Sequence, residues 1–432
     1  MQVCEQTADT ADGVPCDRLR VMSYGRILCL TSNFPRWQGD STTPFVLHLA
    51  QDLQQIGWQV TVLAPHAEGA KRHETLEGIR VRRFRYLLPS RLETVCYQGG
   101  ALINLRKNRL NYAKLPPLVF FEWLQTTLWL LKGKFDLLHS HWLLPQGFIG
   151  ALATAPLGIP HVCTVHGGDV FGLQGAFLKK FKSFAIRRSD AVTVNSSATR
   201  QAVSHLCPDY AALHTIPMGV SAAVCSPHDQ IQAAGIRSRF RRGRGPLLLF
   251  IGRLVEEKGL ADLLDALAFL RDRHQDMTLV VIGEGQDRPF FEKQVHDRGL
   301  ADQVMFTGWL DSDQIPKYLA AADIFVAPSR TAPNGWVEAQ GLTIIEAMMA
   351  GLPVIATNSG GIVDSVCHDA SGLLVPERSP TELAAAITRL ADDPELAKRL
   401  GRRARQEAAA KFSREASAAK FSQLFESLIT KR

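Results

Sequence analysis

The chain of 432 residues is longer than one ordinary hydrophobic core and suits two domains of about 200 residues each. Its hydrophobic content of 46% and charged content of 21% are typical of a globular protein and exclude a disordered chain or a fibre. The net charge of +7 indicates an anionic partner, which leaves nucleic acid, a lipid surface and nucleotide phosphates as the alternatives.

Other features of the whole chain limit the cellular compartment and the class of partner. The eight cysteines form no C-x-x-C pair, which argues against zinc and thioredoxin-type sites and favours a reducing cytosol. No zinc knuckle, RNP aromatic signature or long basic run supports nucleic acid as the partner. Residues 1–25 are polar, lack an apolar segment and are interpreted as a loose tail rather than a signal peptide. The longest apolar stretch, Leu115 to Leu131, carries Glu122 and Gln125 and predicts a buried helix, since it is shorter than a bilayer span.

In the N-terminal half, short apolar runs alternate with helical patterns, as in a parallel α/β sheet. The first strand is predicted at Arg26–Thr31, and a helix follows at Pro44–Ile56, closed by Gly57. Further strands are predicted at residues 59–64, 79–84, 135–139, 161–165, 191–194 and 213–216. Residues 26–220 are therefore interpreted as one Rossmann-like domain.

A polar segment rich in glycine and arginine, residues 221–245, is interpreted as a linker. The pattern restarts in a second domain, residues 246–411, with a helix at Gly259–Arg271. Strands are predicted there at residues 247–251, 278–282, 303–306, 324–327, 353–357 and 372–375. A helical tract over residues 380–431 is predicted to break near Phe412-Ser413, so that residues 412–432 form a separate C-terminal helix. Two doubly wound domains of this kind place a ligand cleft at the carboxyl ends of their strands.

Two carboxylates stand eight positions apart in Glu338-Ala-Gln-Gly-Leu-Thr-Ile-Ile-Glu346. The segment predicts a turn containing Gly341 and a helix that begins near Leu342. Because a helix N-terminus offers unpaired N–H groups and a partial positive charge, it is suited to a diphosphate. Glu338 then precedes the turn, where it can accept hydrogen bonds from sugar hydroxyls, and Glu346 lies where it can hold a ribose diol. By spacing alone, a capping carboxylate and a solvated glutamate explain the pair equally well.

A second motif, Phe-Ile-Gly252-Arg253-Leu-Val-Glu-Glu-Lys258-Gly259, brings two cations to the same edge. Arg253 closes a buried strand and Lys258 opens the next helix, so both are predicted to point into the crevice at the strand ends. Arginine offers a planar fork for phosphate oxygens and lysine a point charge. The two can neutralise a leaving diphosphate without a metal. The alternative is a surface pair of cations bound to the two intervening glutamates.

Together these motifs resemble the family-4 retaining glycosyltransferases of the GT-B fold, and the resemblance spans most of the chain. It continues through Val281-Ile-Gly-Glu-Gly285, Phe306-Thr-Gly-Trp-Leu310, Asp323-Ile-Phe-Val-Ala-Pro-Ser329 and Gly360-Gly361. It implies an α/β fold of two Rossmann-like doubly wound domains that face a central cleft, with the C-terminal helix crossing back to the N-terminal domain. It also implies transfer of a hexosyl unit, with retention, from a nucleotide-diphosphate sugar.

The resemblance assigns roles to residues of the C-terminal domain. Arg253 and Lys258 bind the donor diphosphate, Glu338 contacts the donor sugar, and Glu346 contacts the ribose. The remaining donor-binding residues that it implies are Gly252, then Gly283, Glu284 and the backbone near Leu310 around the nucleobase, and Gly341, Leu342 and Thr343 with N–H groups for phosphate and sugar.

In the N-terminal domain, Val162-Cys-Thr-Val-His166-Gly-Gly-Asp169 fits the family's strand that ends in a histidine reaching the donor sugar. The resemblance thus implies His166 as a catalytic residue, with Asp169 and His141 on the acceptor side. From the residues alone, a structural histidine at position 166 is equally compatible.

The first strand-to-helix loop departs from the family pattern. The family often has a Gly-Gly pair there for the diphosphate, whereas this chain has Gln38-Gly39-Asp-Ser-Thr-Thr43. We expect Gly39 and the neighbouring hydroxyls to replace the pair, which leaves the contacting atoms open.

Two patterns resemble metal-binding sites. Asp311-Ser-Asp313 has the D-x-D spacing that holds a metal in the other large glycosyltransferase fold, but it precedes a helix, where an Asp N-cap explains it better. His139 and His141 share one face of a strand, yet the sequence offers no third zinc ligand. The expectation is therefore no metal and no cofactor, with the NDP-sugar as co-substrate.

The sequence thus predicts a transferase that takes a UDP- or GDP-sugar to a glycan or lipid-linked glycan acceptor for a surface polysaccharide. Basic clusters within residues 82–109 and 179–188 fit a solvated face and an anionic membrane surface equally well, so a cytoplasmic protein, peripheral on the inner face of the plasma membrane, is expected. The rival functions are a nucleotide-sugar epimerase of the same fold and a non-catalytic glycan-binding protein. A nicotinamide dehydrogenase is disfavoured because no G-x-G-x-x-G follows a predicted strand.

Overall fold

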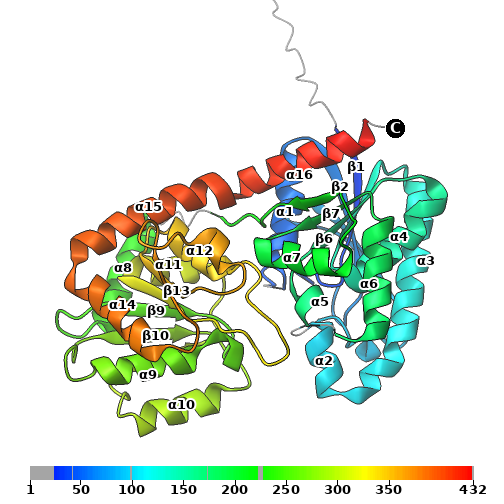
Figure 1. Ribbon diagram of the computed structural model, residues 1–432. Helices are drawn as coiled ribbons and strands as arrows, with labels where there is room; N and C mark the ends of the chain where they lie inside the picture. The colour runs from blue at the N-terminus through cyan, green and yellow to red at the C-terminus, as the bar shows by residue number, and fades with distance from the viewer. Residues whose placement is uncertain (1–23, 41, 98–99, 173, 222–226, 431–432) are drawn as a thin grey trace, which may run out of the picture.

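The computed structural model describes residues 24–430 apart from 41, 98–99, 173 and 222–226, so the predicted tail at 1–25 lies almost wholly outside the described residues. Two α/β units lie side by side, each a sheet covered by helices (Figure 1). The first sheet has the strand order β3 (His73–Leu76), β4 (Ile79–Phe84), β2 (Trp58–Pro65), β1 (Gly25–Leu30), β5 (Leu137–His141), β6 (His161–Val165), β7 (Ala191–Val194) and β8 (Leu213–Thr215). The second sheet has the order β11 (Val304–Gly308), β10 (Thr278–Ile282), β9 (Leu247–Ile251), β12 (Ile324–Ala327), β13 (Val354–Thr357) and β14 (Leu373–Val375).

The helices fall into the same two groups. Those of the first unit are α1 (Pro44–Gln55), α2 (Ala101–Lys107), α3 (Leu115–Gly133), α4 (Phe148–Thr154), α5 (Gly168–Phe171), α6 (Ala176–Arg188) and α7 (Ser197–Leu206). Those that follow are α8 (Pro227–Phe240), α9 (Leu260–Leu270), α10 (Arg288–Asp297), α11 (Ile315–Ala321), α12 (Leu342–Met349), α13 (Ile362–Ser365), α14 (Pro380–Asp392), α15 (Pro394–Phe412) and α16 (Arg414–Ile429).

The sheets confirm the doubly wound fold that the alternating pattern predicts. Neighbouring strands pair in parallel, except that β3 and β4 are antiparallel. Most strands are buried on both faces, which is why they read as continuous apolar runs in the sequence. The sequence did not predict β3, because His73-Glu-Thr-Leu76 is a mostly polar segment on the sheet edge with no apolar run.

The predicted linker at 221–245 is wrong as a structureless segment, because most of it is the helix α8. α8 packs against α11, and Arg237 donates from Nε to the Ala321 carbonyl (2.9 Å) and from Nη2 to Asp323 Oδ1 (2.6 Å). Ala233 and Phe240 are buried in the core of the C-terminal domain. The helix therefore belongs to that domain, although its arginine-rich outer face resembles a linker in composition.

The apolar stretch predicted as a buried helix is helix α3, but only one side of it is buried. Leu118 and Leu130 lie in the core, together with Glu122. In contrast, Phe120 and Leu131 are 53% and 60% exposed. The predicted burial is therefore wrong for half of the helix, and α3 presents an apolar surface outward. No described helix is long and apolar enough to cross a membrane.

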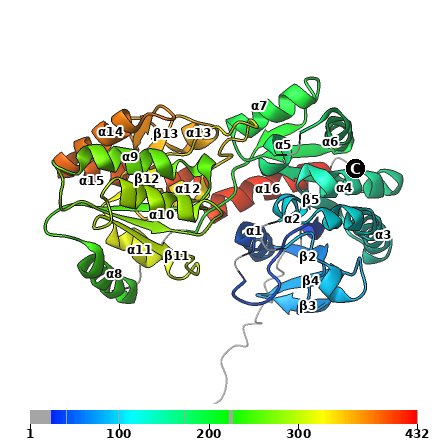
Figure 2. The ribbon, with the colours of Figure 1, turned by 90° about the horizontal axis from the view of Figure 1, so that it is seen from below.

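The C-terminal helix crosses back to the N-terminal domain, as predicted; Figure 2 shows α16 (red) passing from one unit to the other. Arg414 Nη2 pairs with Asp52 Oδ1 of α1 at 2.6 Å, and Trp58 Nε1 donates to Ser422 Oγ at 2.9 Å. The break predicted near residue 413 is present, since the Ser413 side chain caps α16 by accepting from a backbone N–H. α16 therefore ties the two domains together at the side of the molecule where α1 lies.

Candidate active site

The predicted site residues meet where the two domains touch. Gly167, just after β6, faces Ala339, and a Cβ built on Gly167 would lie 2.3 Å from the Ala339 Cβ. The φ of Gly167 is 99°, which also favours glycine. The loop that carries His166 is therefore held against the loop that carries Glu338.

Two sets of hydrogen bonds fix the same interface. The Ser197 N–H donates to Asp364 Oδ2 at 2.6 Å. The Gln340 side chain accepts from the Met218 N–H at 3.0 Å and donates to the Met218 carbonyl at 2.8 Å. A hollow of about 570 Å³ opens beside these contacts, between α7 and the turns around Val337 and Gly360. This hollow shows that the two domains do not seal completely against each other at this interface.

The side chains of Lys258 and Glu338 form an ion pair across this site and are only 20% and 14% exposed. Lys258 Nζ also lies 5.5 Å from the ring centroid of Trp336. Burial acts to raise the pKa of Glu338, but the Lys258 ammonium, followed by the Gly341 N–H and Arg253, brings it below its ordinary value. Glu338 is therefore ionised at neutral pH, beside two cations.

Arg253 follows β9 directly, and its side chain is exposed. Among the described residues, Arg253 forms no ion pair with a carboxylate, and Lys258 pairs with Glu338 rather than with either intervening glutamate. Glu256 instead lies 3.7 Å from Arg330. Within the part of the chain that the structure describes, the two cations therefore do not form the surface arrangement in which Glu256 and Glu257 would neutralise them. Arg253 is positioned to receive an anion.

Helix α12 begins after Gly341, whose φ of 72° lies in the left-handed region. No described side chain caps this helix, so the N–H groups at Leu342 and Thr343 in its first turn have no side-chain acceptor. Their contact with phosphate or sugar stays a prediction. Glu346 lies one turn further along and has no hydrogen-bond partner among the described residues. Burial raises the pKa of Glu346 to about 7.

The residues predicted around the nucleobase lie at the ends of β9, β10 and β11. A Cβ on Gly283 would lie 2.0 Å from the Gly252 carbonyl oxygen, so the two strand ends approach this closely because residue 283 is glycine. Glu284 is exposed and pairs with Arg288, while Leu310 is partly buried against the C-terminal core. The structure brings these residues together at one edge of the sheet; their contact with a base stays a prediction.

A row of imidazoles stands behind the interface in the N-terminal domain. His166 Nε2 lies 2.9 Å from His141 Nδ1, and the ring centroids of His141 and His139 are 4.3 Å apart. Burial lowers the pKa of His166 and of His139 to about 3, and it lowers the pKa of His141 well below its ordinary value. These rings are therefore neutral at neutral pH, and one of each hydrogen-bonded pair donates while the other accepts.

Two predicted acceptor-side residues need correction. His141 is 1% exposed and lies behind His166, so it orients that ring instead of facing an acceptor. Asp169 is 3% exposed, and its oxygens accept from the backbone N–H groups of Leu143 (2.8 Å) and Gly167 (3.0 Å). The resemblance placed both residues on the acceptor side, yet their polar atoms are used to hold the His166 loop. Asp169 also lines the apolar cavity between α2, α4 and α6.

The predicted Asp N-cap of α11 is also wrong. α11 begins after Gln314 without a side-chain cap, and Asp313 Oδ2 accepts from the Gln314 side chain at 3.0 Å. Pro316 stands in the first turn, where it removes one of the N–H groups that a capping carboxylate would accept from. Across the residues the structure describes, no group of three His, Cys, Asp or Glu side chains is placed to hold a metal ion.

Gly39 lies on an exposed part of the loop before α1, and a Cβ built on it would meet no atom within 4 Å. The loop is braced from within, since Asp40 accepts from Arg36 Nε at 2.7 Å and from Thr42 Oγ1 at 2.9 Å. This conformation leaves Gly39 exposed. Contact between Gly39 and a diphosphate stays a prediction.

Aromatic side chains at the site were missed from the sequence. Phe45 and Trp142 lie against His166, with ring centroids 5.1 and 4.9 Å from the imidazole. Trp336 covers Lys258 within the C-terminal domain. Their positions in the sequence could have identified them as site residues, because Trp142 directly follows the strand that ends at His141 and Trp336 stands two residues before Glu338.

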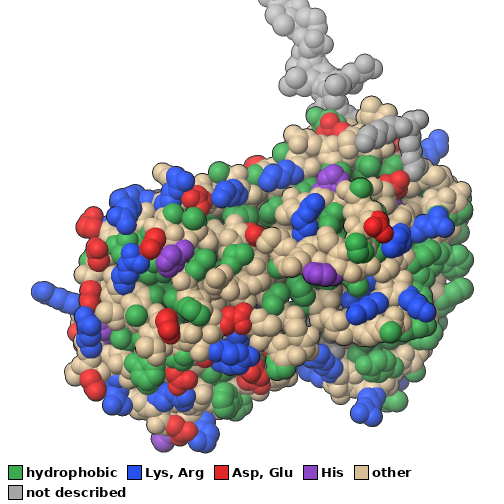
Figure 3. All heavy atoms as spheres, in the orientation of Figure 1, with side chains coloured by type: hydrophobic (Ala, Val, Ile, Leu, Met, Phe, Trp, Pro, Cys, Tyr) green, Lys and Arg blue, Asp and Glu red, His purple; other side chains and the backbone are tan. Residues whose placement is uncertain are grey.

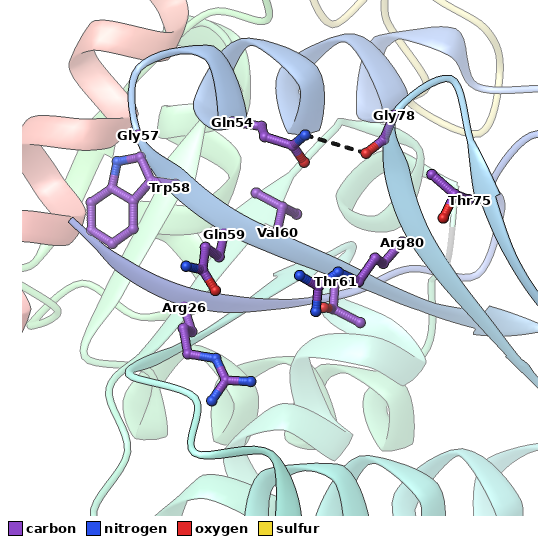
Figure 4. A pocket seen from close by; sticks show the side chains of 10 residues that line it. All are labelled: Arg26, Gln54, Gly57, Trp58, Gln59, Val60, Thr61, Thr75, Gly78 and Arg80. Carbon is purple, nitrogen blue, oxygen red and sulfur yellow. Dashed lines mark hydrogen bonds between the residues drawn. The ribbon is translucent and has the colours of Figure 1, made fainter. Parts of the chain in front are cut away.

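A separate hollow of about 480 Å³ lies at the amino ends of β1 and β2 (Figure 4). Arg26, Gln59 and Arg80 line it, and Gln54 Nε2 donates to the Gly78 carbonyl at its edge, at 3.2 Å. Since the amino ends of parallel strands lie at the opposite edge of the sheet from their carboxyl ends, this hollow is remote from His166.

Two doubly wound domains that face each other across strand ends define the GT-B class of fold. Solved structures agree: the chain is similar to sucrose-phosphate synthase from Thermosynechococcus elongatus, with a TM-score of 0.75 and 24% identity, covering 94% of this chain and 100% of that one. It is also similar to HepE from Anabaena in complex with UDP, with a TM-score of 0.70 and 20% identity, covering 93% of this chain and 100% of that one.

Residues 42–219 match the family described as glycosyl transferase 4-like domain, and residues 235–407 match the family described as glycosyl transferases group 1. A D-inositol 3-phosphate glycosyltransferase of Jonesia denitrificans is 31% identical over 64% of this chain and 68% of that protein. The chain belongs to glycosyltransferase family 4.

A further relative is the GDP-mannose-dependent alpha-(1-6)-phosphatidylinositol monomannoside mannosyltransferase of Mycobacterium tuberculosis, 37% identical over 54% of this chain. The matched region spans 60% of the length of that mannosyltransferase.

Proposed function

We propose that the protein is a retaining hexosyltransferase that moves a sugar from an NDP-sugar to a saccharide or lipid-linked saccharide acceptor. The observation that carries this proposal is the grouping of an unpaired Arg253, the Lys258–Glu338 pair and the uncapped start of α12 in one interdomain site. Such a site neutralises a diphosphate without a metal. Solved relatives that bind UDP and UDP-glucose support the nucleotide-sugar donor.

The chemistry proposed here needs leaving-group stabilisation more than a nucleophile. Arg253, Lys258 and the N–H groups of α12 stabilise the negative charge that develops on the departing diphosphate. Glu338 accepts hydrogen bonds from the donor sugar, and neutral His166 makes one polar contact with the same sugar from the opposite domain. The contact between the two loops excludes water and so suppresses hydrolysis of the donor.

The decisive test is donor-dependent stabilisation against a panel of UDP- and GDP-sugars, followed by product analysis. A transferase shows a rise in melting temperature with one or a few donors, and NMR of the transfer product shows the anomeric configuration of the donor. Conversion of the donor sugar without an acceptor would identify an epimerase instead. Stabilisation by glycans but by no NDP-sugar would identify a glycan-binding protein.

Nucleotide binding should depend on the ionisation of Glu346. The pKa of this carboxyl is raised to about 7, so it takes up a proton as the pH falls through 7 and loses strength as an acceptor for the ribose hydroxyls. We expect NDP affinity to fall about tenfold between pH 8 and pH 6, the difference between a charged and a neutral hydrogen bond. Calorimetric titration measures it. Glu346→Gln should bind NDP weakly and equally at both pH values, whereas Glu395→Gln, which alters an exposed carboxyl, should behave as wild type.

Activity should survive exhaustive treatment with EDTA. The reason is that Arg253, Lys258 and the start of α12 already supply the positive charge that a divalent ion provides elsewhere. Initial rates before and after chelation measure this. A loss of activity that Mn²⁺ or Mg²⁺ alone restores would contradict the site assignment.

We further propose a cytoplasmic protein of surface-polysaccharide synthesis that binds the anionic face of the membrane. Exposed cations on α2 and α6 support this, among them Arg106, Lys107, Lys179 and Lys180. The protein should sediment with anionic liposomes at low salt and be released as salt rises, since exposed charges are screened over about 8–10 Å. Equal sedimentation with neutral liposomes would exclude an electrostatic attachment.

A further inference from the structure

An apolar cavity of about 460 Å³ lies in the N-terminal domain beside the predicted site. Helix α2 and the first turns of α3 form one wall, and the π-turn at Leu143–Gly147 together with α4 and α6 forms the other. The volume is within the range of about 300–1,000 Å³ that is usual for small-molecule sites. The apolar lining includes Leu105, Leu115, Val119, Leu144, Phe148 and Phe181.

One end of this cavity is polar and lies at the reacting edge of the sheet. Ser32 and Asn33 follow β1, Trp142 follows β5 and Gly168 follows β6, and all of them line the cavity. The Trp142 ring lies 4.9 Å from that of His166, centroid to centroid. The cavity therefore runs from an apolar interior to the place where the donor sugar is proposed to react.

Trp142 holds this position at a conformational cost. Its φ is 74° and its ψ is 141°, a region that residues other than glycine rarely adopt. Its N–H donates to the Thr164 carbonyl at 2.8 Å, and its carbonyl accepts from the Gly147 N–H at 2.9 Å. Backbone strain of this kind is concentrated at ligand sites. The strain keeps an indole between the cavity and the imidazole.

Exposed cations stand next to lining residues on two of the walls: Arg106 and Lys107 follow Leu105 on α2, and Lys179 and Lys180 follow Leu178 on α6. Leu110 and Phe177 are each 72% exposed, and the Phe177 ring lies 4.8 Å, centroid to centroid, from Phe181 in the cavity wall. Figure 3 shows hydrophobic side chains gathered over α3 and α4 at the right-hand edge, with Lys and Arg beside them. Within the described part of the chain, no carboxylate forms an ion pair with Arg106, Lys107, Arg109, Lys179 or Lys180.

We propose that this cavity binds the hydrocarbon chain of the acceptor, so that the acceptor is an amphiphile with an anionic headgroup rather than a free saccharide. The inference rests on the proposed function. It explains why an apolar cavity ends at Trp142, whose ring lies against His166, and why cations that attract an anionic headgroup stand on the helices that form its walls. An isoprenoid chain and an acyl chain have the same apolar chemistry here.

Calorimetric titration with decyl phosphate, kept below its micelle concentration, tests the cavity. We expect binding near one molecule per chain with a negative heat-capacity change, and no binding of inorganic phosphate at the same concentration. Ala101→Trp, which fills the cavity from α2, should weaken binding tenfold or more, because each excluded methylene costs about fourfold in affinity. Leu178→Ser, in the opposite wall, should also weaken it. Ala397→Trp fills a hollow of about 360 Å³ in the C-terminal domain and should bind as wild type.

The cations on α2 beside the cavity are tested with a separate variant. The double variant Arg106→Gln and Lys107→Gln should weaken decyl phosphate severalfold and leave uncharged decyl glucoside unchanged, whereas Arg80→Gln, in the remote hollow of Figure 4, should change neither. Farnesyl phosphate and dioctanoyl phosphatidic acid are the competing probes. Displacement of decyl phosphate by either supports the proposal and identifies the chain type; displacement by neither overturns it.

Donor binding separates this inference from the function on which it rests. If Ala101→Trp and Leu178→Ser bind decyl phosphate as tightly as wild type, with unchanged melting, the cavity is not the lipid site. The donor-dependent rise in melting temperature would then still hold. If no NDP-sugar stabilises the protein, the proposed function fails whatever the cavity binds.

Discussion

Replacing Arg253 or Lys258 by alanine should lower kcat by about tenfold to a hundredfold or more in each case, because one charge-assisted hydrogen bond contributes about 1.5–3 kcal/mol. The loss should fall on kcat more than on KM, since the charge on the diphosphate grows as its bond to the sugar breaks. The double variant should lose less than the product of the single losses, because both cations serve one anion. Steady-state kinetics with a saturating donor measures all three.

The structure supplies controls for this experiment. Arg273→Ala removes a cation that is 65% exposed and pairs with Asp392 on the surface, so it should leave kcat unchanged. Glu338→Ala should weaken discrimination among donor sugars while NDP binding stays nearly intact. If Arg253→Ala and Lys258→Ala keep near wild-type kcat/KM with unchanged melting profiles, the site lies elsewhere.

The free energy of unfolding should fall steeply as the pH is lowered below about 6.5. His139, His161 and His166 have their pKa lowered to about 3 by burial, and His141 is also lowered, so all four stay neutral in the folded protein. In the unfolded chain they titrate near 6.5. Between those values the unfolded state binds more protons at these histidines, so they lower stability as the pH falls, by about 1.4 kcal/mol per pH unit for each group. The buried carboxyls of Glu122 and Glu346, whose pKa is raised to about 8 and about 7, act in the opposite direction and offset part of this loss.

Urea unfolding at several pH values between 7.5 and 4.5 measures the slope. His161→Gln should make the slope shallower by one group's contribution, whereas His296→Asn, whose side chain is 89% exposed, should leave it unchanged. A slope that is the same in His161→Gln as in the wild type would show that this imidazole is not held neutral as the structure indicates.

The fold followed from the sequence wherever strands are buried on both faces. The run Leu247–Ile251 is apolar at every position and Thr278–Ile282 at all but the first, and their predicted ends match the structure. The same pattern failed at the edge strand β3, whose residues are polar, and in α8, whose arginines conceal a buried face. Local composition reports burial only where most of a segment is buried.

The candidate site could be predicted in part for a similar reason. A strand end followed by glycine and charge, as at Gly252-Arg253, identifies a cleft because parallel strands present their carboxyl ends at one edge. Glu338 was identified by the turn and helix start that follow it. What such a pattern does not contain is the partner of each side chain. Lys258 pairs with Glu338, and His141 with His166, through contacts between segments distant in sequence.

The sequence by itself determined the two doubly wound domains, the cation and carboxylate motifs, and the edge at which they gather. These depend on local periodicity and on which residues follow a strand. Only the tertiary structure decided that Asp169 and His141 turn inward, that α3 exposes half of its apolar surface, and that a cavity opens beside Trp142. Burial and hydrogen bonding of a polar side chain depend on what other elements bring against it, and that is set by packing between parts of the chain that local patterns do not connect.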